Sequence, residues 1–216
     1  MKTARLPNPP VLVVTDRQQC RAALNTEDAI YRVADAVFAA GGRWISLREK
    51  DLDPEVQKTL ALELKRRAAC YGFAARVSVH GLPEVALKAH TDGVHLPGNA
   101  DAGEARQLLG PEVLIGQSVH TVAEAHTANP EVLDYLIAGP IFETPSKPGY
   151  GPALGEAGLA AIVQAARLPV IAIGGIEPAM VPLCLQAGAA GVAVMGGVMR
   201  AATPETVVRA FVDQFA

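Results

Sequence analysis

The sequence predicts an α/β protein that forms a single (β/α)8 barrel, the TIM-barrel architecture, over residues 1–216. Short β-rich runs alternate with longer amphipathic stretches from one end of the chain to the other, which is typical of repeated β-α units. The apolar runs are nearly continuous, as in VLVV and VIAI, and this indicates parallel strands covered on both faces. Eight units of similar length favour closure into a barrel, and an open doubly wound sheet is the alternative.

Each candidate strand is a short run rich in apolar and β-branched residues. In chain order the strands are residues 11–14, 44–47, 76–79, 93–95, 114–118, 135–138, 170–173 and 191–194. Residues 26–40, 54–71 and 157–167 have helical character, and several such segments open with Thr, Asp or Pro near the first turn. Residues 139–155 follow the sixth strand without periodicity and are rich in Gly and Pro, so we expect a loop that covers the substrate.

The composition argues against nucleic acids and membranes as partners. The net charge is −3, and the 19 basic residues are scattered among 22 acidic ones, so no basic surface is predicted. The amino terminus has no apolar signal segment, and no apolar run reaches the length of a membrane span. Three cysteines occur without a CxxC or Cys/His ligand spacing, which is typical of a reducing cytosol. We expect a soluble, cytoplasmic protein, and a homo-oligomer is compatible with this sequence.

Polar residues gather where the predicted strands end. In a (β/α)8 barrel the functional groups come from the carboxyl ends of the strands and the loops that follow them. The second strand runs into LREK, SVH occurs at the ends of the third and fifth, and the loop after the sixth carries TPSK. A lone polar residue there is more often a loop cap, but convergence on one rim favours a site. The candidate substrate-binding residues are Arg48, Lys50, His80, Ser118, Thr144, Ser146 and Lys147.

Two basic residues follow the second strand at a spacing that suits an anion. Arg48 and Lys50 are two positions apart on an extended segment, so their side chains point the same way and could hold one negatively charged group. Solvated ion pairs with Glu49 or Asp51 are the alternative.

Glycines end the last two strands. The segments IAIGGI and VAVMGG allow backbone N–H groups to approach an anion where a side chain would obstruct it. The loops after the seventh and eighth strands are the usual phosphate site of such barrels, whereas a single Gly-Gly pair is as often a tight turn. The candidate phosphate-binding residues are Gly174, Gly175, Met195, Gly196 and Gly197.

Seven segments carry a family resemblance over nearly the whole chain. They are VVTD, GGRWISLREK, DGVHLP, IGQSVHTVAEA, GPIFETPSKPGYG, LPVIAIGGI and AGAAGVAVMGGVM. In this order they resemble the thiamine phosphate synthase and thiazole tautomerase superfamily. The resemblance implies a (β/α)8 barrel that acts on a thiazole phosphate in thiamine biosynthesis. The synthase branch joins a hydroxymethylpyrimidine diphosphate to that thiazole phosphate, with Mg2+ stabilising the departing pyrophosphate.

Two departures from the synthase pattern concern its metal. Synthases carry Asn-Asp after the third strand, where this chain has His80-Gly81, and Gly-Gln-Glu-Asp after the fourth, where it has residues 97–100, Pro-Gly-Asn-Ala. Both aspartates that help to hold Mg2+ are therefore missing from their places, although Asp101 is displaced by one residue. The usual glutamine before the LREK run is Ser46. These departures favour the tautomerase branch, for which we expect no metal or other cofactor.

In the tautomerase branch, an isomerase aromatises a carboxythiazole phosphate by moving a proton. Histidine can accept and donate a proton near neutral pH, and His120 of the SVH motif matches the catalytic histidine of the family. His80 could be a second acid or base, a donor to a carboxylate, or a packing residue. The alternatives are a thiamine phosphate synthase with relocated metal ligands and, from another class, a non-catalytic regulator that binds thiamine phosphates.

Overall fold

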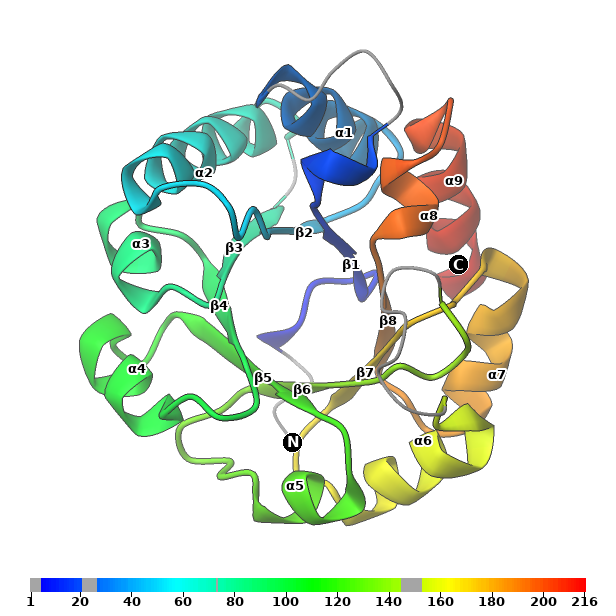
Figure 1. The fold of residues 1–216 in the computed structure, drawn as a ribbon. Coiled ribbons are helices and arrows are strands. Elements are labelled where there is room, and N and C mark those ends of the chain that lie inside the picture. The colour runs from blue at the N-terminus through cyan, green and yellow to red at the C-terminus, as the bar shows by residue number, and fades with distance from the viewer. Residues whose placement is uncertain (1–4, 21–26, 73, 145–152) are drawn as a thin grey trace.

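Eight parallel strands close into a barrel in chain order, and the helices form a ring outside them (Figure 1). The structure is a computed structural model that describes residues 5–20, 27–72, 74–144 and 153–216. Closure is direct, because the first strand pairs with both the second and the eighth, with Val13 in register with Ile45 and with Val194. The predicted (β/α)8 barrel is confirmed, and the open doubly wound sheet is wrong.

The strands occupy the predicted places. They are β1 (Val11–Val14), β2 (Trp44–Leu47), β3 (Arg76–His80), β4 (Gly93–Leu96), β5 (Leu114–Val119), β6 (Tyr135–Ala138), β7 (Val170–Ile173) and β8 (Gly191–Val194). β3, β4 and β5 each run one residue further than predicted, because that residue still pairs with the next strand: His80 with His95, Leu96 with Gln117, and Val119 with Ala138.

The helices that cover the barrel are mostly short. They are α1 (Glu27–Ala39), α2 (Pro54–Ala69), α3 (Pro83–Lys88), α4 (Ala102–Leu109), α5 (Val122–Thr127), α6 (Gly155–Ala165), α7 (Val181–Gln186), α8 (Gly196–Met199) and α9 (Pro204–Val212). One-turn 3-10 segments also occur, among them η2 (Arg17–Gln19), η3 (Pro178–Met180) and η4 (Asp213–Phe215). Among the described residues, no helix combines the length and the apolar character that crossing a bilayer requires.

Side-chain caps fix where some of the helices begin, among them α2 and α5. Asp53 accepts a hydrogen bond from Glu55 N at 2.9 Å before α2, and Pro54 stands at the first helical position, where its missing N–H costs nothing. Thr121 and Glu124 form a capping box on α5, each side chain bonded to the other's backbone N–H. These caps satisfy backbone N–H groups that the first turn of a helix leaves without partners.

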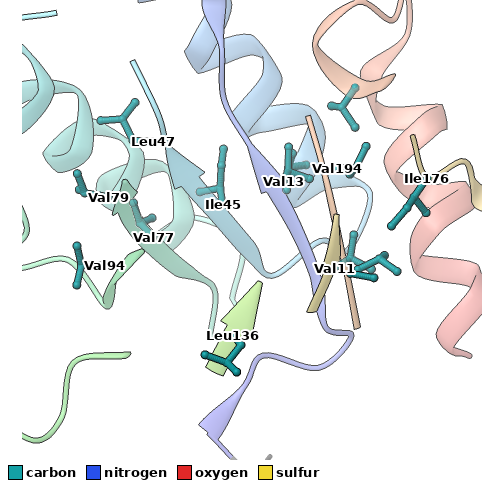
Figure 2. Packing of buried hydrophobic residues seen from close by; sticks show 14 of the residues in the cluster. Val11, Val13, Ile45, Leu47, Val77, Val79, Val94, Leu136, Ile176 and Val194 are labelled. Atoms are coloured by element: carbon teal, nitrogen blue, oxygen red, sulfur yellow. The ribbon is translucent and has the colours of Figure 1, made fainter. Parts of the chain in front are cut away.

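Side chains alternate between two buried layers along every strand. The outer layer packs against the helices, and Figure 2 shows part of it, including Val11 and Val13 on β1 and Val77 and Val79 on β3. The inner layer fills the barrel and contains Leu12, Trp44, Leu114, Tyr135, Ile137, Ile171 and Ala193. This filled interior confines any site to the ends of the strands.

The Tyr135 side chain requires a glycine beside it in the barrel interior. Its fully buried ring lies 4.9 Å from that of Trp44, centroid to centroid, and occupies the space beside Gly116. A Cβ on Gly116 would overlap the tyrosine ring, so the small residue on β5 makes room for the large one on β6.

A buried ion network closes the amino-terminal end of the barrel. Asp134 is inaccessible to solvent, and its carboxylate lies 2.6 Å from both Arg5 and Arg106. It also accepts a hydrogen bond of 2.9 Å from Ile115 N. Because Asp134 precedes β6, this network lies at the end of the barrel opposite to the strand carboxyl ends.

Candidate functional site

The carboxyl ends of β6, β7 and β8 surround a cavity of about 300 Å³. Its lining includes six of the predicted residues: Thr144, Gly174, Gly175, Met195, Gly196 and Gly197. The structure thus brings all five predicted phosphate-binding residues together with one residue of the loop after β6. That they bind a phosphate stays a prediction. Ser146 and Lys147 lie outside the described residues.

The segment after β6 passes so close to the turn after β7 that two glycines are required in this turn. Gly174 and Gly175 have φ values of 103° and 64°, in the left-handed region that favours glycine. A Cβ on Gly174 would lie 2.7 Å from Pro140 Cα, and one on Gly175 would lie 2.8 Å from Phe142 Cβ. The loop after β6 is bonded to this turn, since Phe142 N donates to Gly174 O at 2.9 Å. These glycines therefore hold the loop against the cavity, in addition to any contact with an anion.

Gly196 is restricted by a side chain instead. A Cβ there would lie 2.6 Å from Nη2 and 2.7 Å from Cζ of Arg200, so the guanidinium group covers this glycine. Gly197 is less crowded, because its Cβ would meet Val194 Cγ2 at an ordinary 3.5 Å. The two glycines at the start of α8 therefore differ in what a substitution would disturb.

Arg48 extends from the end of β2 toward the end of β8. Its Nη1 lies 3.9 Å from Met195 Sδ and 3.8 Å from Asp16 Oδ2. Its backbone N–H donates to Thr15 Oγ1 at 3.0 Å, which fixes the segment between β1 and β2. Arg48 therefore brings a positive charge to the edge of the cavity, which Met195 also lines.

The neighbouring carboxylates are engaged with a different arginine. Arg17 binds Glu49 at 3.1 Å and Asp51 at 2.7 Å, and the Arg17 hydrogen bond lowers the pKa of Asp51 to about 2. Glu49 is buried, and burial raises its pKa although Thr15 and Arg17 donate to it. The alternative in which Glu49 or Asp51 pairs with Arg48 or Lys50 is therefore wrong in this structure, because Arg17 occupies both carboxylates.

Lys50 remains beside Arg48 as a second positive charge. The charge of Arg48, followed by partial burial, lowers the pKa of Lys50 below its usual value. Within the part of the chain that the structure describes, Lys50 has no carboxylate at ion-pair distance. Two like charges held together in this way favour a bound anion, which would relieve their repulsion.

His120 lies just after β5 and faces the end of β6. Its Nδ1 is 2.7 Å from Gly139 O. Since a carbonyl oxygen only accepts, Nδ1 carries the proton and Nε2 is the basic nitrogen of the ring. The backbone N–H of His120 donates to the Glu124 carboxylate of the capping box, so the start of α5 fixes the main chain of the histidine.

His80 and Ser118 meet through a third residue inside the barrel mouth. The ring of His80 lies 4.9 Å from that of His95, centroid to centroid, and His95 Nε2 lies 2.9 Å from Ser118 Oγ. His95, to which sequence reasoning gave no role, thus connects the two predicted residues. A signal was present, because His80 ends β3 and His95 lies next to the last residue of β4, but only the pairing register places them side by side.

The described residues do not form a metal site from protein ligands alone. Mg2+ prefers hard oxygen ligands, and in phosphate sites it is commonly held by one or two carboxylates together with substrate phosphates and waters. Among the described residues, no three His, Cys, Asp or Glu side chains are grouped so that they could hold a metal ion. The Asp101 carboxylate caps α4, accepting from Gly103 N at 2.7 Å and from Glu104 N at 3.1 Å. It is therefore engaged with the helix and does not replace the missing aspartates.

Sequence reasoning missed Arg200, which lines the cavity and follows α8. The signal was its spacing from Gly196. Four positions separate the two residues, and helical side chains lean toward the amino terminus, so an arginine there reaches back over the first residue of the helix.

The fold and the rim define the class: a (β/α)8 barrel whose strand ends present glycine turns and basic side chains to one cavity. The chain belongs to the thiamine monophosphate synthase family, whose model matches residues 11–198. The match covers all eight strands and the glycines of both phosphate-site candidates.

Individual relatives support the same family. The thiamine-phosphate synthase of Roseiflexus castenholzii is 37% identical over 205 residues, which cover 94% of this chain and 86% of that protein. The bifunctional protein ThiM/ThiE of Symbiobacterium thermophilum is 40% identical over 184 residues, which are 84% of this chain but only 38% of that protein. The solved structure of thiamine phosphate pyrophosphorylase from Pyrococcus furiosus is 27% identical, with a TM-score of 0.80 and coverage of 99% and 98% of the two chains.

These relatives correct the prediction of a tautomerase-type isomerase, which is wrong. The relatives compared over most of the chain are named as synthases, so the family resemblance is confirmed but its assignment to the tautomerase branch is not. The prediction relied on the two missing aspartates. Individual ligand positions can change while the remaining chain keeps the pattern of its relatives, and here that pattern is the synthase one.

Proposed function

We propose that this chain is a thiamine-phosphate synthase, which joins a hydroxymethylpyrimidine diphosphate to a thiazole phosphate. The observation that carries the proposal is the 37% identity to the Roseiflexus castenholzii synthase over 94% of the chain. The rim supports it, because the two substrates carry two phosphate groups of different kinds and the chain presents two separate sets of candidate anion ligands.

The reaction makes one bond and breaks one. The ring nitrogen of the thiazole donates its lone pair to the methylene carbon of the pyrimidine, and the carbon–oxygen bond to the diphosphate breaks. The diphosphate leaves with the bonding electrons, so the charge that develops is negative and lies on its oxygens. The protein's task is then to hold two anionic substrates in line and to stabilise the departing anion.

The residues divide between these tasks by position. The turns that contain Gly174, Gly175, Gly196 and Gly197 would hold the thiazole phosphate at the cavity, and Arg48 and Lys50 would hold the diphosphate. Ser118, His120 and Thr144 would contact the organic parts, with His80 and His95 behind Ser118. Because the coupling moves no proton onto or off the ring nitrogen, we assign His120 to orientation.

The test is incubation of the purified protein with both substrates, with thiamine phosphate followed by mass spectrometry and pyrophosphate by a pyrophosphate-release assay. We expect the two products in equal amounts. Binding of the substrates without any product would contradict the proposal and indicate a regulator that binds thiamine phosphates. We further propose a cytoplasmic location, which fractionation of the source cells would check.

A further inference from the structure

Arg200 covers Gly196 in the wall of the cavity at the ends of β6, β7 and β8. Its backbone N–H donates to Gly196 O at 3.1 Å, and its guanidinium occupies the space beside the glycine, with Nη2 and Cζ at 2.6 and 2.7 Å from where a Cβ would lie. Both residues line the cavity. An anion on this side of Gly196 would therefore meet the guanidinium.

An uncharged side chain holds this guanidinium in place. The guanidinium donates to the side-chain oxygen of Gln19, whose amide in turn donates to Asp16 Oδ2 at 2.7 Å. Gln19 belongs to η2, which is a neighbour of α8 in the fold (Figure 1). The amide fixes the direction of the arginine in advance of any ligand and leaves its positive charge uncompensated.

The other charged residues of the cavity wall are acidic. In the described lining, Arg200 is the one basic residue, and Glu143 after β6 and Glu177 after β7 accompany it. The guanidinium has no carboxylate at ion-pair distance among the described residues. All three side chains are exposed, so solvent screens their long-range fields. The formal charge of this wall does not attract an anion, and binding there depends on directed hydrogen bonds from the guanidinium.

We infer that Arg200 binds the phosphate of the thiazole substrate and makes this cavity selective for a single phosphate group. A guanidinium can direct two parallel N–H donors at two oxygens of one phosphate. A second phosphate group would add negative charge beside Glu143 and Glu177, with no further basic residue in the described lining to offset it. The diphosphate is then left to Arg48 and Lys50, which do not line this cavity.

Gly196 has a different task in this arrangement from the glycines after β7. Gly174 and Gly175 leave room for the loop after β6, whereas Gly196 leaves room for the guanidinium that reaches back along α8. The inference rests on the proposed function for the identity of the phosphate ester. Its binding can nevertheless be measured without the coupling reaction.

The first experiment is calorimetric titration of the purified protein with thiazole phosphate and, separately, with inorganic pyrophosphate. We expect Arg200→Gln to weaken thiazole phosphate about tenfold, at the lower end of the range for a hydrogen bond to a charged group because the guanidinium is exposed. The affinity for pyrophosphate should not change. Arg200→Lys keeps the charge without the planar fork and should lie between the wild type and Arg200→Gln. Unaltered affinity for thiazole phosphate in Arg200→Gln, or an equal loss for pyrophosphate, would overturn the inference.

A double variant tests the selectivity from the opposite direction. The wild-type protein should bind thiazole phosphate and pyrophosphate together, because they occupy different places. In Glu143→Gln/Glu177→Gln the carboxylates no longer oppose a second phosphate group, so pyrophosphate should displace thiazole phosphate in a competition titration. Competition in the wild type, or its absence in the double variant, would show that the two carboxylates do not confer the selectivity.

Arg209→Gln is the matched control. Arg209 is also on the last part of the chain, but it pairs with Glu205 at 3.0 Å and donates to Ala39 O at the end of α1, near the amino-terminal end of the barrel. We expect its replacement to leave the affinity for thiazole phosphate unchanged. Circular dichroism of each variant would confirm that the barrel is folded.

The coupling assay separates the two substrates kinetically. Arg200→Gln should raise the KM for thiazole phosphate about tenfold and leave the KM for the pyrimidine diphosphate unchanged. A rise in the KM for the diphosphate alone would overturn the inference and leave the synthase function standing. Absence of coupling in the wild-type protein would contradict the synthase function, and the titration with thiazole phosphate would then decide the role of Arg200 independently.

Discussion

The Arg200 guanidinium occupies the space that a side chain at position 196 would need, so substitutions of Gly196 should affect ligand binding. We expect Gly196→Ala to displace the guanidinium and to weaken binding of a phosphate ligand about tenfold, because the Cβ would lie 2.6 Å from Nη2. Gly197→Ala should have a smaller effect, since its Cβ makes an ordinary contact. Titration with inorganic phosphate or thiazole phosphate measures both.

A double-mutant cycle shows whether the arginine carries the effect. If Gly196→Ala acts by moving Arg200, it should cost little more in an Arg200→Gln background. Fully additive losses would instead mean that the added methyl group obstructs the anion itself. Gly174 and Gly175 are less informative, because a side chain on either would also collide with the loop after β6.

The lysine beside Arg48 predicts a pH dependence. Arg48 and burial lower the pKa of Lys50, so the ammonium group loses its proton at a lower pH than that of an ordinary lysine, whose pKa is about 10.4. Only the protonated form attracts an anion, and pyrophosphate affinity should therefore fall as the pH rises through the lowered pKa.

Lys50→Arg separates this effect from the titration of pyrophosphate. Arginine keeps its charge over the whole range, so the ratio of the two proteins' affinities should change between pH 7 and about 10. A constant ratio would show that Lys50 does not take part in binding.

Among the helices, α4 offers a test of the metal assignment. Asp101 caps it through Gly103 N and Glu104 N, and Asp101→Ala should destabilise the protein by about 1 kcal/mol in urea unfolding. Asp101→Asn should retain most of that stability, because asparagine is an equally good cap. Neither change should abolish coupling. Loss of coupling in a stable Asp101→Asn protein would identify the carboxylate as a metal ligand and contradict its structural role.

The barrel as a whole depends on an ion network far from the site. Asp134 is buried between Arg5 and Arg106, so Asp134→Ala leaves two arginines without their carboxylate and should cost about 3 kcal/mol in the free energy of unfolding. Glu205→Ala removes an exposed partner of Arg209 and should cost less than about 1 kcal/mol. Urea unfolding compares the two. Equal losses would show that the buried network contributes no more than a surface pair.

The function of Asp134 is structural. The Asp134→Ala variant therefore tests whether stability can be lowered without a change in activity. The network lies at the amino-terminal end, whereas the cavity lies at the carboxyl ends of the strands. The protein that remains folded should therefore couple its substrates at the normal rate. A decrease in turnover beyond the unfolded fraction would mean that the two ends communicate.

The sequence alone determined the eight β-α units and the rim on which the candidate residues lie. Strand periodicity is a local property, and five of the eight strands have the predicted bounds because consecutive apolar residues suffice to define a strand buried on both faces. The same locality explains why LREK, SVH and the glycine pairs could be assigned to strand ends before their neighbours were known.

Only the tertiary structure decided which charges meet. Arg17 is 32 residues from Glu49 and Arg200 is 181 residues from Gln19, and no spacing in the sequence predicts either contact. The ring neighbours His80 and His95 depend in the same way on the register of β3 and β4. Free cations and engaged carboxylates can be distinguished only when distant segments close into a barrel, because charge balance is a property of three-dimensional distance.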